Sequence, residues 1–150
     1  MVPTRKLLQE ALKFLTTAGA TGTDPLLVGA KVGLFSGSPN LTVATVIGDL
    51  TEAVYTGYAR QSLGTLSAQY TDDNGDEQRD SALLTFAPSG STTGDVITGW
   101  FLVDSGGTML LGAEYLDSPK TMSGADDHLP IVISPTMPLG TILGQSTQVI

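Results

Sequence analysis

Residues 96–116, VITGWFLVDSGGTMLLGAEYL, contain two apolar runs joined by a short polar segment, and this pattern decides the fold. Both runs are short and rich in apolar residues, and the segment between them is Asp-Ser-Gly-Gly, Asp104 to Gly107. Glycine, aspartate and serine are favoured in tight turns, and apolar runs flanking such a turn are typical of paired strands. The stretch therefore predicts a β-hairpin.

The first of these runs is apolar on both faces. Its apolar residues are distributed over both sides, Ile97, Trp100 and Leu102 as well as Val96, Phe101 and Val103. Residues 131–133, IVI, show no polar alternation at all. A sheet with one face in water should alternate, so something must cover the second face. The sequence leaves two candidates for this cover, an amino-terminal helix and another subunit. We expect Trp100 to lie in the core or at a subunit contact.

The chain after Pro25 consists of short apolar runs separated by Gly, Pro, Ser, Asn and Asp. This pattern predicts a mainly β fold, an antiparallel β-sandwich or barrel of jelly-roll-like type, over residues 26–150. Asn74-Gly75 predicts a tight hairpin turn within residues 72–77. The expected strands cover residues 27–35, 53–59, 62–70, 82–87, 96–103, 109–116 and 129–134.

Residues 1–25 are expected to form a separate arm, with one amphipathic helix over residues 4–17 followed by a small-residue linker. Leu7, Leu8, Leu12 and Leu15 follow helical spacing, Pro3 suits a helix start, and Gly19 suits its end. This helix either folds back on its own domain or docks on a neighbour. The four leucines and Trp100 are the residues for which we expect an assembly contact.

Composition limits the classes of protein to consider. The 150 residues include no cysteine, which excludes disulfides and cysteine-based metal sites. No apolar run approaches the roughly 20 residues needed to span a bilayer, so we expect a soluble chain with no membrane partner. The residues up to Lys31 carry a net charge of plus two and the remainder minus ten. Because this acidic body repels phosphate groups, we expect no direct binding of nucleic acid.

Candidate catalytic and metal-binding residues are few. Asp104-Ser105-Gly106 matches the triplet of an aspartic protease, which would have to dimerise to supply a second carboxylate. The hairpin turn explains more of the surrounding residues, so the protease is only a remote alternative. His128 is the lone histidine, residues 72–76 match a calcium loop incompletely, and residues 33–37, GLFSG, place the serine wrongly for a nucleophile elbow. We therefore expect a protein that is not an enzyme, with no catalytic, metal or cofactor-binding residues.

Three segments of the β region carry a further signal when they are taken together. They are AKVGLFSGSPNLTVATVIGDLTEAVYTGYAR (residues 30–60), GWFLVDSGGTMLLGAEYLDSPKTM (residues 99–122) and DHLPIVISPTM (residues 127–137). These segments resemble a set of small tailed-bacteriophage virion proteins. The resemblance implies a structural protein of the virion, foremost a capsid decoration or cement protein. Its partners would be copies of itself and other virion proteins, such as the major capsid or tail proteins, and it would assemble in the host cytoplasm. The alternative is a tail or fibre module that binds a receptor or carbohydrate.

Overall fold

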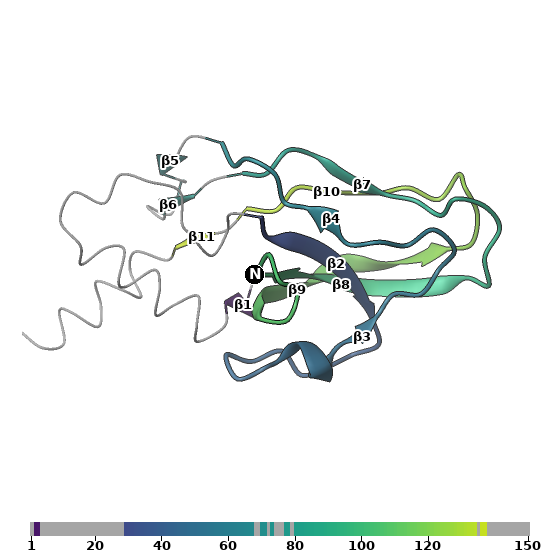
Figure 1. The fold of residues 1–150 in the computed structure, drawn as a ribbon, viewed down its shortest axis with the longest axis horizontal. Helices are drawn as coiled ribbons and strands as arrows, with labels where there is room; N and C mark the ends of the chain where they lie inside the picture. The colour runs from purple at the N-terminus through teal and green to yellow at the C-terminus, as the bar shows by residue number, and fades with distance from the viewer. Residues whose placement is uncertain are drawn as a thin grey trace, which may run out of the picture.

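The computed structural model describes residues 2–3, 29–67, 70–71, 73, 77–78, 80–134 and 136–137. Regular structure in these ranges is antiparallel β apart from one turn of 3-10 helix, η1 (Ile47–Asp49), so the mainly β fold is confirmed (Figure 1). Residues 4–28, which include the helix expected over residues 4–17, lie outside the described residues. Nowhere in the described ranges is a helix long and apolar enough to cross a membrane.

The central sheet is built around the hairpin that the opening stretch predicts. Its order is β1 (Val2–Pro3), β9 (Leu110–Met122), β8 (Asp95–Val103), β2 (Lys31–Ser36) and β3 (Thr51–Glu52), and β4 (Gln61–Ser62) also pairs with β2. All of these pairings are antiparallel. The predicted β8–β9 hairpin is therefore confirmed, and β8 lies at the middle of the sheet.

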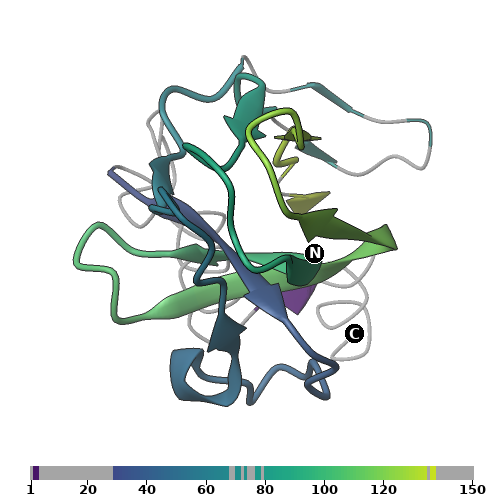
Figure 2. The same cartoon turned by 90° about the vertical axis from the view of Figure 1, so that its right-hand side faces the viewer.

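A second layer lies on one side of this sheet, above β2, β8 and β9 in Figures 1 and 2. Here β7 (Leu84–Phe86) pairs with β10 (Leu129–Ile131). The same two chain segments pair again further along, where β6 (Glu77–Gln78) meets β11 (Thr136–Met137). β5 (Tyr70–Thr71) pairs antiparallel with β6, so the chain reverses between them. The tight turn expected at Asn74-Gly75 lies outside the described residues.

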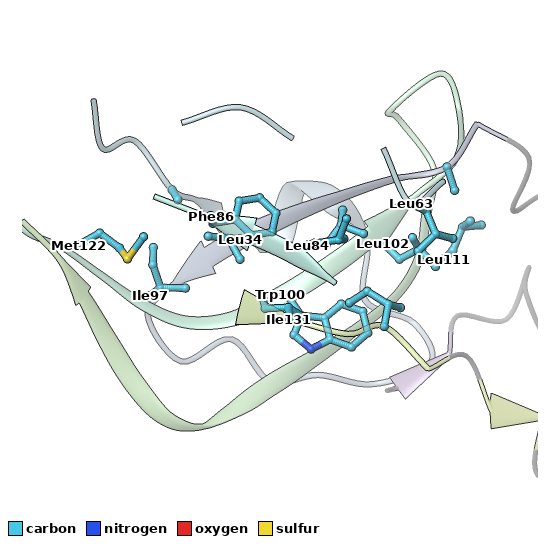
Figure 3. Close-up of a cluster of buried hydrophobic side chains, with 14 of the residues drawn as sticks. Leu34, Leu63, Leu84, Phe86, Ile97, Trp100, Leu102, Leu111, Met122 and Ile131 are labelled. Atoms are coloured by element: carbon cyan, nitrogen blue, oxygen red, sulfur yellow. The ribbon is translucent and has the colours of Figure 1, made fainter. Parts of the chain in front are cut away.

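The main hydrophobic core fills the space between these two layers (Figure 3). Trp100 and Leu102 alternate to this side of β8, and the irregularity between Ile97 and Gly99 turns Ile97 to the same side, where the three meet Leu84 and Phe86 of β7. Trp100 is only 6 % exposed, so it lies in the core, which is one of the two locations expected for it. Burial of these side chains supplies most of the hydrophobic stabilisation of the domain.

A smaller core lies on the opposite face of the sheet and explains why β8 is apolar on both sides. Phe35, Phe101, Val103, Leu110 and Ala113 form this cluster together with Leu50, and Leu41 and Ile47 pack against it. The last three residues belong to the segment between β2 and β3, which we call the strap (residues 37–50). The strap lies below the sheet in Figure 1. At this cluster the cover is thus a loop of the same chain, which we did not predict from the sequence.

Two glycines and two phenylalanines face one another across the β2–β8 ladder. Gly33 is the register partner of Phe101, and Phe35 is the partner of Gly99. A Cβ atom on Gly33 would overlap the ring of Phe101, and one on Gly99 would overlap the ring of Phe35 and the carbonyl oxygen of Glu114. Each ring therefore packs on the backbone of the opposite glycine, which gives two large rings room on one face of adjacent strands.

Two expected strands differ from the structure. Residues 53–59 leave the sheet after β3 and return at β4, because Gly57 takes a φ of 83° and the Tyr58 amide donates to the carbonyl of Tyr55 at 3.0 Å. Of the strand expected over residues 62–70, the described residues 63–67 are irregular, between β4 and β5. In residues 53–59 the β propensity of individual residues is overridden by a turn that the pattern of apolar residues does not reveal.

Strand β9 is longer than expected, because it passes through a bulge. Ile97 pairs with Lys120 and Gly99 pairs with Tyr115, so residues 116–119 form a large bulge opposite a single residue of β8. Pro119 lies in this bulge, where the missing backbone N–H removes no ladder hydrogen bond. The strand therefore continues to Met122 despite its proline.

We expect Gly99→Ala to lower the free energy of unfolding by about 1–3 kcal/mol, because the added methyl group forces Phe35 or the β8–β9 ladder to move. Gly48→Ala is the matched control, since a Cβ atom there meets nothing within 4 Å. Urea unfolding followed by the fluorescence of Trp100, the only tryptophan, measures both variants. Equal midpoints for the two variants would contradict this packing.

Candidate functional site

The residues expected to make assembly contacts fall in two parts of the chain. Leu7, Leu8, Leu12 and Leu15 lie outside the described residues, so their role stays a prediction. Trp100 is buried between the two layers of its own domain. Trp100 is thus the only one of the five that the structure describes, and its assembly role also stays a prediction.

The most developed polar cluster closes a gap in the edge of the central sheet. β3 pairs with one end of β2 and β4 with the other, and neither pairs with the middle of β2. At this gap the amide of Leu34 donates to the hydroxyl oxygen of Tyr58 at 3.0 Å, and the amide of Ala53 donates to the carbonyl of Leu34 at 2.9 Å. The excursion over residues 53–60 thus satisfies the backbone groups that a continuous strand would otherwise pair.

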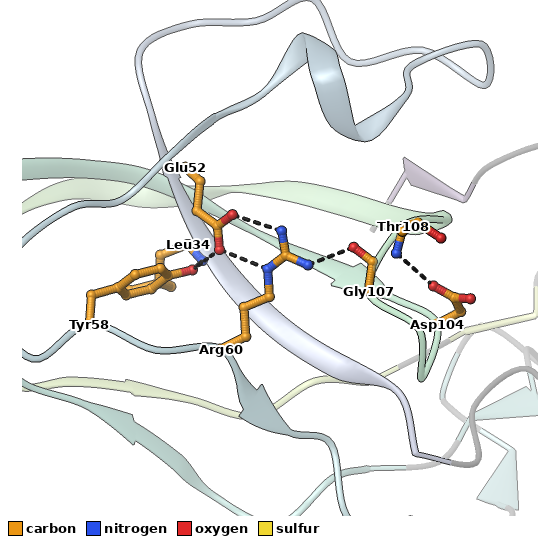
Figure 4. Close-up of polar contacts among 7 residues, drawn as sticks. All are labelled: Leu34, Glu52, Tyr58, Arg60, Asp104, Gly107 and Thr108. Atoms are coloured by element: carbon orange, nitrogen blue, oxygen red, sulfur yellow. Dashed lines mark hydrogen bonds and ion pairs between the residues drawn. The ribbon is translucent and has the colours of Figure 1, made fainter.

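Arg60 connects this cluster to the β8–β9 hairpin (Figure 4). Its Nε and Nη2 donate to the two carboxylate oxygens of Glu52 at 2.8 and 2.7 Å, a bidentate arrangement. Nη1 donates to the carbonyl of Gly107 at 2.7 Å. The guanidinium carbon lies 5.2 Å from the centre of the Phe101 ring, within the range of a cation–π contact. One side chain therefore joins β3, the hairpin turn and the smaller core.

The charges in the cluster stabilise one another. Hydrogen bonds from Arg60 hold the pKa of Glu52 below its ordinary value of 4.5, against the opposing effect of burial. Burial raises the pKa of the Tyr58 phenol, whose hydroxyl donates to Glu52 at 2.7 Å. Burial, with a smaller contribution from Asp95, raises the pKa of nearby Tyr55 to about 12. At neutral pH the cluster holds a paired carboxylate and guanidinium beside two neutral phenols.

The carboxylate of Asp104 is used within its own turn. Its Oδ1 accepts hydrogen bonds from the amides of Thr108 at 3.0 Å and Met109 at 2.9 Å. These backbone N–H groups, that of Met109 foremost, lower the pKa of Asp104. Gly107 takes a φ of 76°, which suits glycine. The Asp-Ser-Gly-Gly segment is a hairpin turn, as the sequence predicts.

Asp127 holds a second turn in the same way. Its Oδ2 accepts from the amide and hydroxyl of Ser123 at 2.8 and 2.9 Å and from the amide of Gly124 at 3.0 Å. These bonds, led by the Ser123 amide, lower the pKa of Asp127 to about 2. His128 follows this turn and is exposed.

The other candidate ligand residues are not assembled into a site in the part of the chain that the structure describes. No group of three or more His, Asp or Glu side chains able to hold a metal ion occurs there. Of the incomplete calcium-loop residues, Asp72, Asn74 and Asp76 lie outside the described residues. Residues 33–37, GLFSG, form the second half of β2 and the start of the strap rather than a nucleophile elbow.

Exposed apolar side chains lie on both outer layers of the domain. On the second layer, Leu83 is 63 % exposed and Val132 is 48 % exposed, each next to a residue of the Leu84–Ile131 pair. On the strap, Val43 and Val46 are 47 % and 57 % exposed. Apolar side chains on outer layers can contact another macromolecule. Leu83, Val132, Val43 and Val46 are thus the large apolar side chains that the second layer and the strap leave exposed.

A scan of protein-family models and searches of curated proteins and of solved structures find no match to this chain. The polar cluster therefore has to be judged on its own geometry. We assigned Glu52, Tyr58 and Arg60 no role from the sequence. The sequence did contain a signal that could have pointed to this cluster, because Arg60 is one of only three cations after Lys31 among thirteen acidic residues.

We expect Glu52→Gln to lower the free energy of unfolding at pH 7 by about 1 kcal/mol, a value discounted for partial exposure of the pair. Because the pKa of Glu52 is lowered on folding from 4.5, its contribution is present above pH 4.5 and is lost as the pH falls through the folded-state pKa. The unfolding curves of the two proteins should therefore converge on acidification. Asp117→Asn, an exposed acid on β9, controls for the loss of one charge. A difference that stays constant down to pH 3 would contradict this account.

We expect Asp104→Ala to lower the free energy of unfolding by about 1 kcal/mol, because the amides of Thr108 and Met109 lose their acceptor. Asp126→Ala, an exposed acid in the turn after β9, is the control. Urea midpoints at pH 7 measure both. A midpoint for Asp104→Ala equal to that of the control would show that the carboxylate does not hold the hairpin turn.

Proposed function

We propose that this chain is a non-enzymatic structural protein of a tailed-bacteriophage particle, foremost a capsid decoration or cement protein. It acts by making contacts, through its β domain and through the helix expected over residues 4–17. The finer fold that we propose is a two-layer antiparallel sandwich of jelly-roll-like type with that helix attached. The proposal draws its identity from the sequence resemblance and its mode of action from the surface of the domain.

The observation that carries the mode of action is the combination of satisfied polar clusters with exposed apolar side chains. Glu52, Arg60, Asp104 and Asp127 each hold a loop or turn. Leu83 and Val132, by contrast, project from the second layer without being buried. A protein that acts through assembly needs stable loops and apolar contact surface more than it needs free reactive groups.

The experiment compares the sedimentation-equilibrium mass of the full chain with that of a Leu8→Ser, Leu12→Ser double variant. We expect the full chain to form an oligomer and the double variant to have a lower mass, because the apolar face of the expected helix is lost. The urea midpoint of the β domain should not change, which separates loss of contact from loss of folding. Gln9→Ser, a polar position of the same segment, is the matched control.

The other functions predict different results. A full chain that is monomeric at every concentration and does not bind isolated phage shells would contradict the proposal. Binding of glycans by that monomer would favour the receptor-binding module of a tail or fibre. Peptide cleavage that disappears in Asp104→Ala would favour the protease.

A further inference from the structure

The outer edge of β9 is occupied by a very short strand from a distant part of the chain. Val2 pairs with Ala113 and Pro3 pairs with Gly112, and among the described residues no other strand lies on this edge. Gly112 and Ala113 are both buried. Backbone groups at a buried position need hydrogen-bond partners, so this part of the edge requires a strand. Any copy of Val2–Pro3 fits it equally well.

The connection from β1 to β2 does not restrict β1 to its own domain. β1 and β2 lie on either side of the β9–β8 pair. Pro3 pairs with Gly112, Gly112 pairs with Leu102, and Leu102 pairs with Val32, the residue after Lys31. Three strand spacings of about 4.8 Å separate β1 from β2, roughly 15 Å. The connection, residues 4–28, has 25 residues and can span at most about 80–90 Å. A compact domain of this size has a radius of gyration of about 14 Å, so the arm is long enough to reach β9 of a neighbour.

Charge favours a neighbour as the second host for this strand. The residues up to Lys31 carry plus two, with Arg5 and Lys6 directly after β1, and the rest of the chain carries minus ten. Two acidic bodies repel each other, whereas a basic arm laid on the acidic body of another copy lowers this repulsion. The arm is thus the part of the chain whose charge complements a second copy.

We propose that β1 is exchanged between copies, so that Val2–Pro3 of one chain pairs with Gly112–Ala113 of β9 in a neighbour. The docking surface is the outer edge of β9, and its occupant is a second copy of this chain. Exchange of an identical element creates an intermolecular contact from groups already complementary within one chain. Pairing within the chain corresponds to an effective concentration of about millimolar, so exchange competes when neighbours are equally concentrated. This inference rests on the proposed function, because a particle surface supplies that crowding.

The test uses cysteine trapping in the full chain, which has no native cysteine. Val2→Cys and Ala113→Cys are made in separate chains, one of them isotopically labelled, and mixed under mild oxidation. Directly opposed residues of antiparallel strands have Cα atoms about 4.5–5.5 Å apart, a separation that a disulfide accepts. We expect a mixed disulfide between labelled and unlabelled chains, at least tenfold more abundant at about 1 mM than at about 10 μM protein.

Two controls make each result decisive. Val2→Cys mixed with Ser118→Cys, an exposed position on β9 that is not its partner, reports random collision. The double variant Val2→Cys, Ala113→Cys reports pairing within one chain. If Ala113→Cys disturbs folding, Pro3→Cys with Gly112→Cys repeats the test at the neighbouring register position.

A mixed disulfide no more abundant than in the Ser118 control at 1 mM overturns the proposal, whether or not the double variant closes within its own chain. This failure is distinct from failure of the proposed function. An oligomeric mass for the unmodified chain without the mixed disulfide would mean that the chain assembles through other surfaces.

Discussion

The fold depends on the reciprocal packing of Phe35 on Gly99 and of Phe101 on Gly33. These four residues are register partners on the two central strands, β2 and β8. Because neither glycine has a side chain, two large rings occupy one face of adjacent strands without separating their backbones. A shift of register by one residue would place each ring against a side chain and turn the apolar residues of β8 to the wrong layers. The two glycines therefore fix both the pairing and the sidedness of the sheet.

A sheet that is apolar on both faces needs two covers, and the chain supplies them differently. Regular pairing of β7 with β10 covers the larger core, whereas the strap covers the smaller one with Leu41, Ile47 and Leu50. The strap is held at its start by side chains of the sheet, since Thr98 donates to the carbonyl of Gly37 at 2.7 Å and Tyr115 donates to that of Pro39. Arg60 lies over Phe101 and bonds to Glu52, so the polar cluster and the smaller core stabilise each other.

What the sequence could predict depended on how local the signal was. The β8–β9 hairpin follows from neighbouring residues, namely two apolar runs and the Asp-Ser-Gly-Gly turn between them. The excursion over residues 53–60 depends on contacts with Leu34 and Gly107, which are distant in the chain, so its apolar residues were misread as a strand. Cover by the strap likewise depends on where residues 41–50 return in space. Burial of Trp100, one of the expected site residues, could be predicted from its apolar neighbours. The polar cluster of Glu52, Tyr58 and Arg60 could not be predicted, because its members come together only in the fold.

The outer edge of β9 favours an added strand at Gly112–Ala113, where β1 pairs, over an added strand along the rest of its length. Beyond Ala113 the strand carries Glu114 and then the bulge of residues 116–119, which contains Asp117 and Pro119. Charges, bulges and proline all disfavour an added strand, and two identical β9 edges would bring like charges together. The two small residues Gly112 and Ala113 carry none of these features. The edge thus rejects strands along most of its length and accepts one at the position that β1 occupies, which makes any exchange specific for this chain.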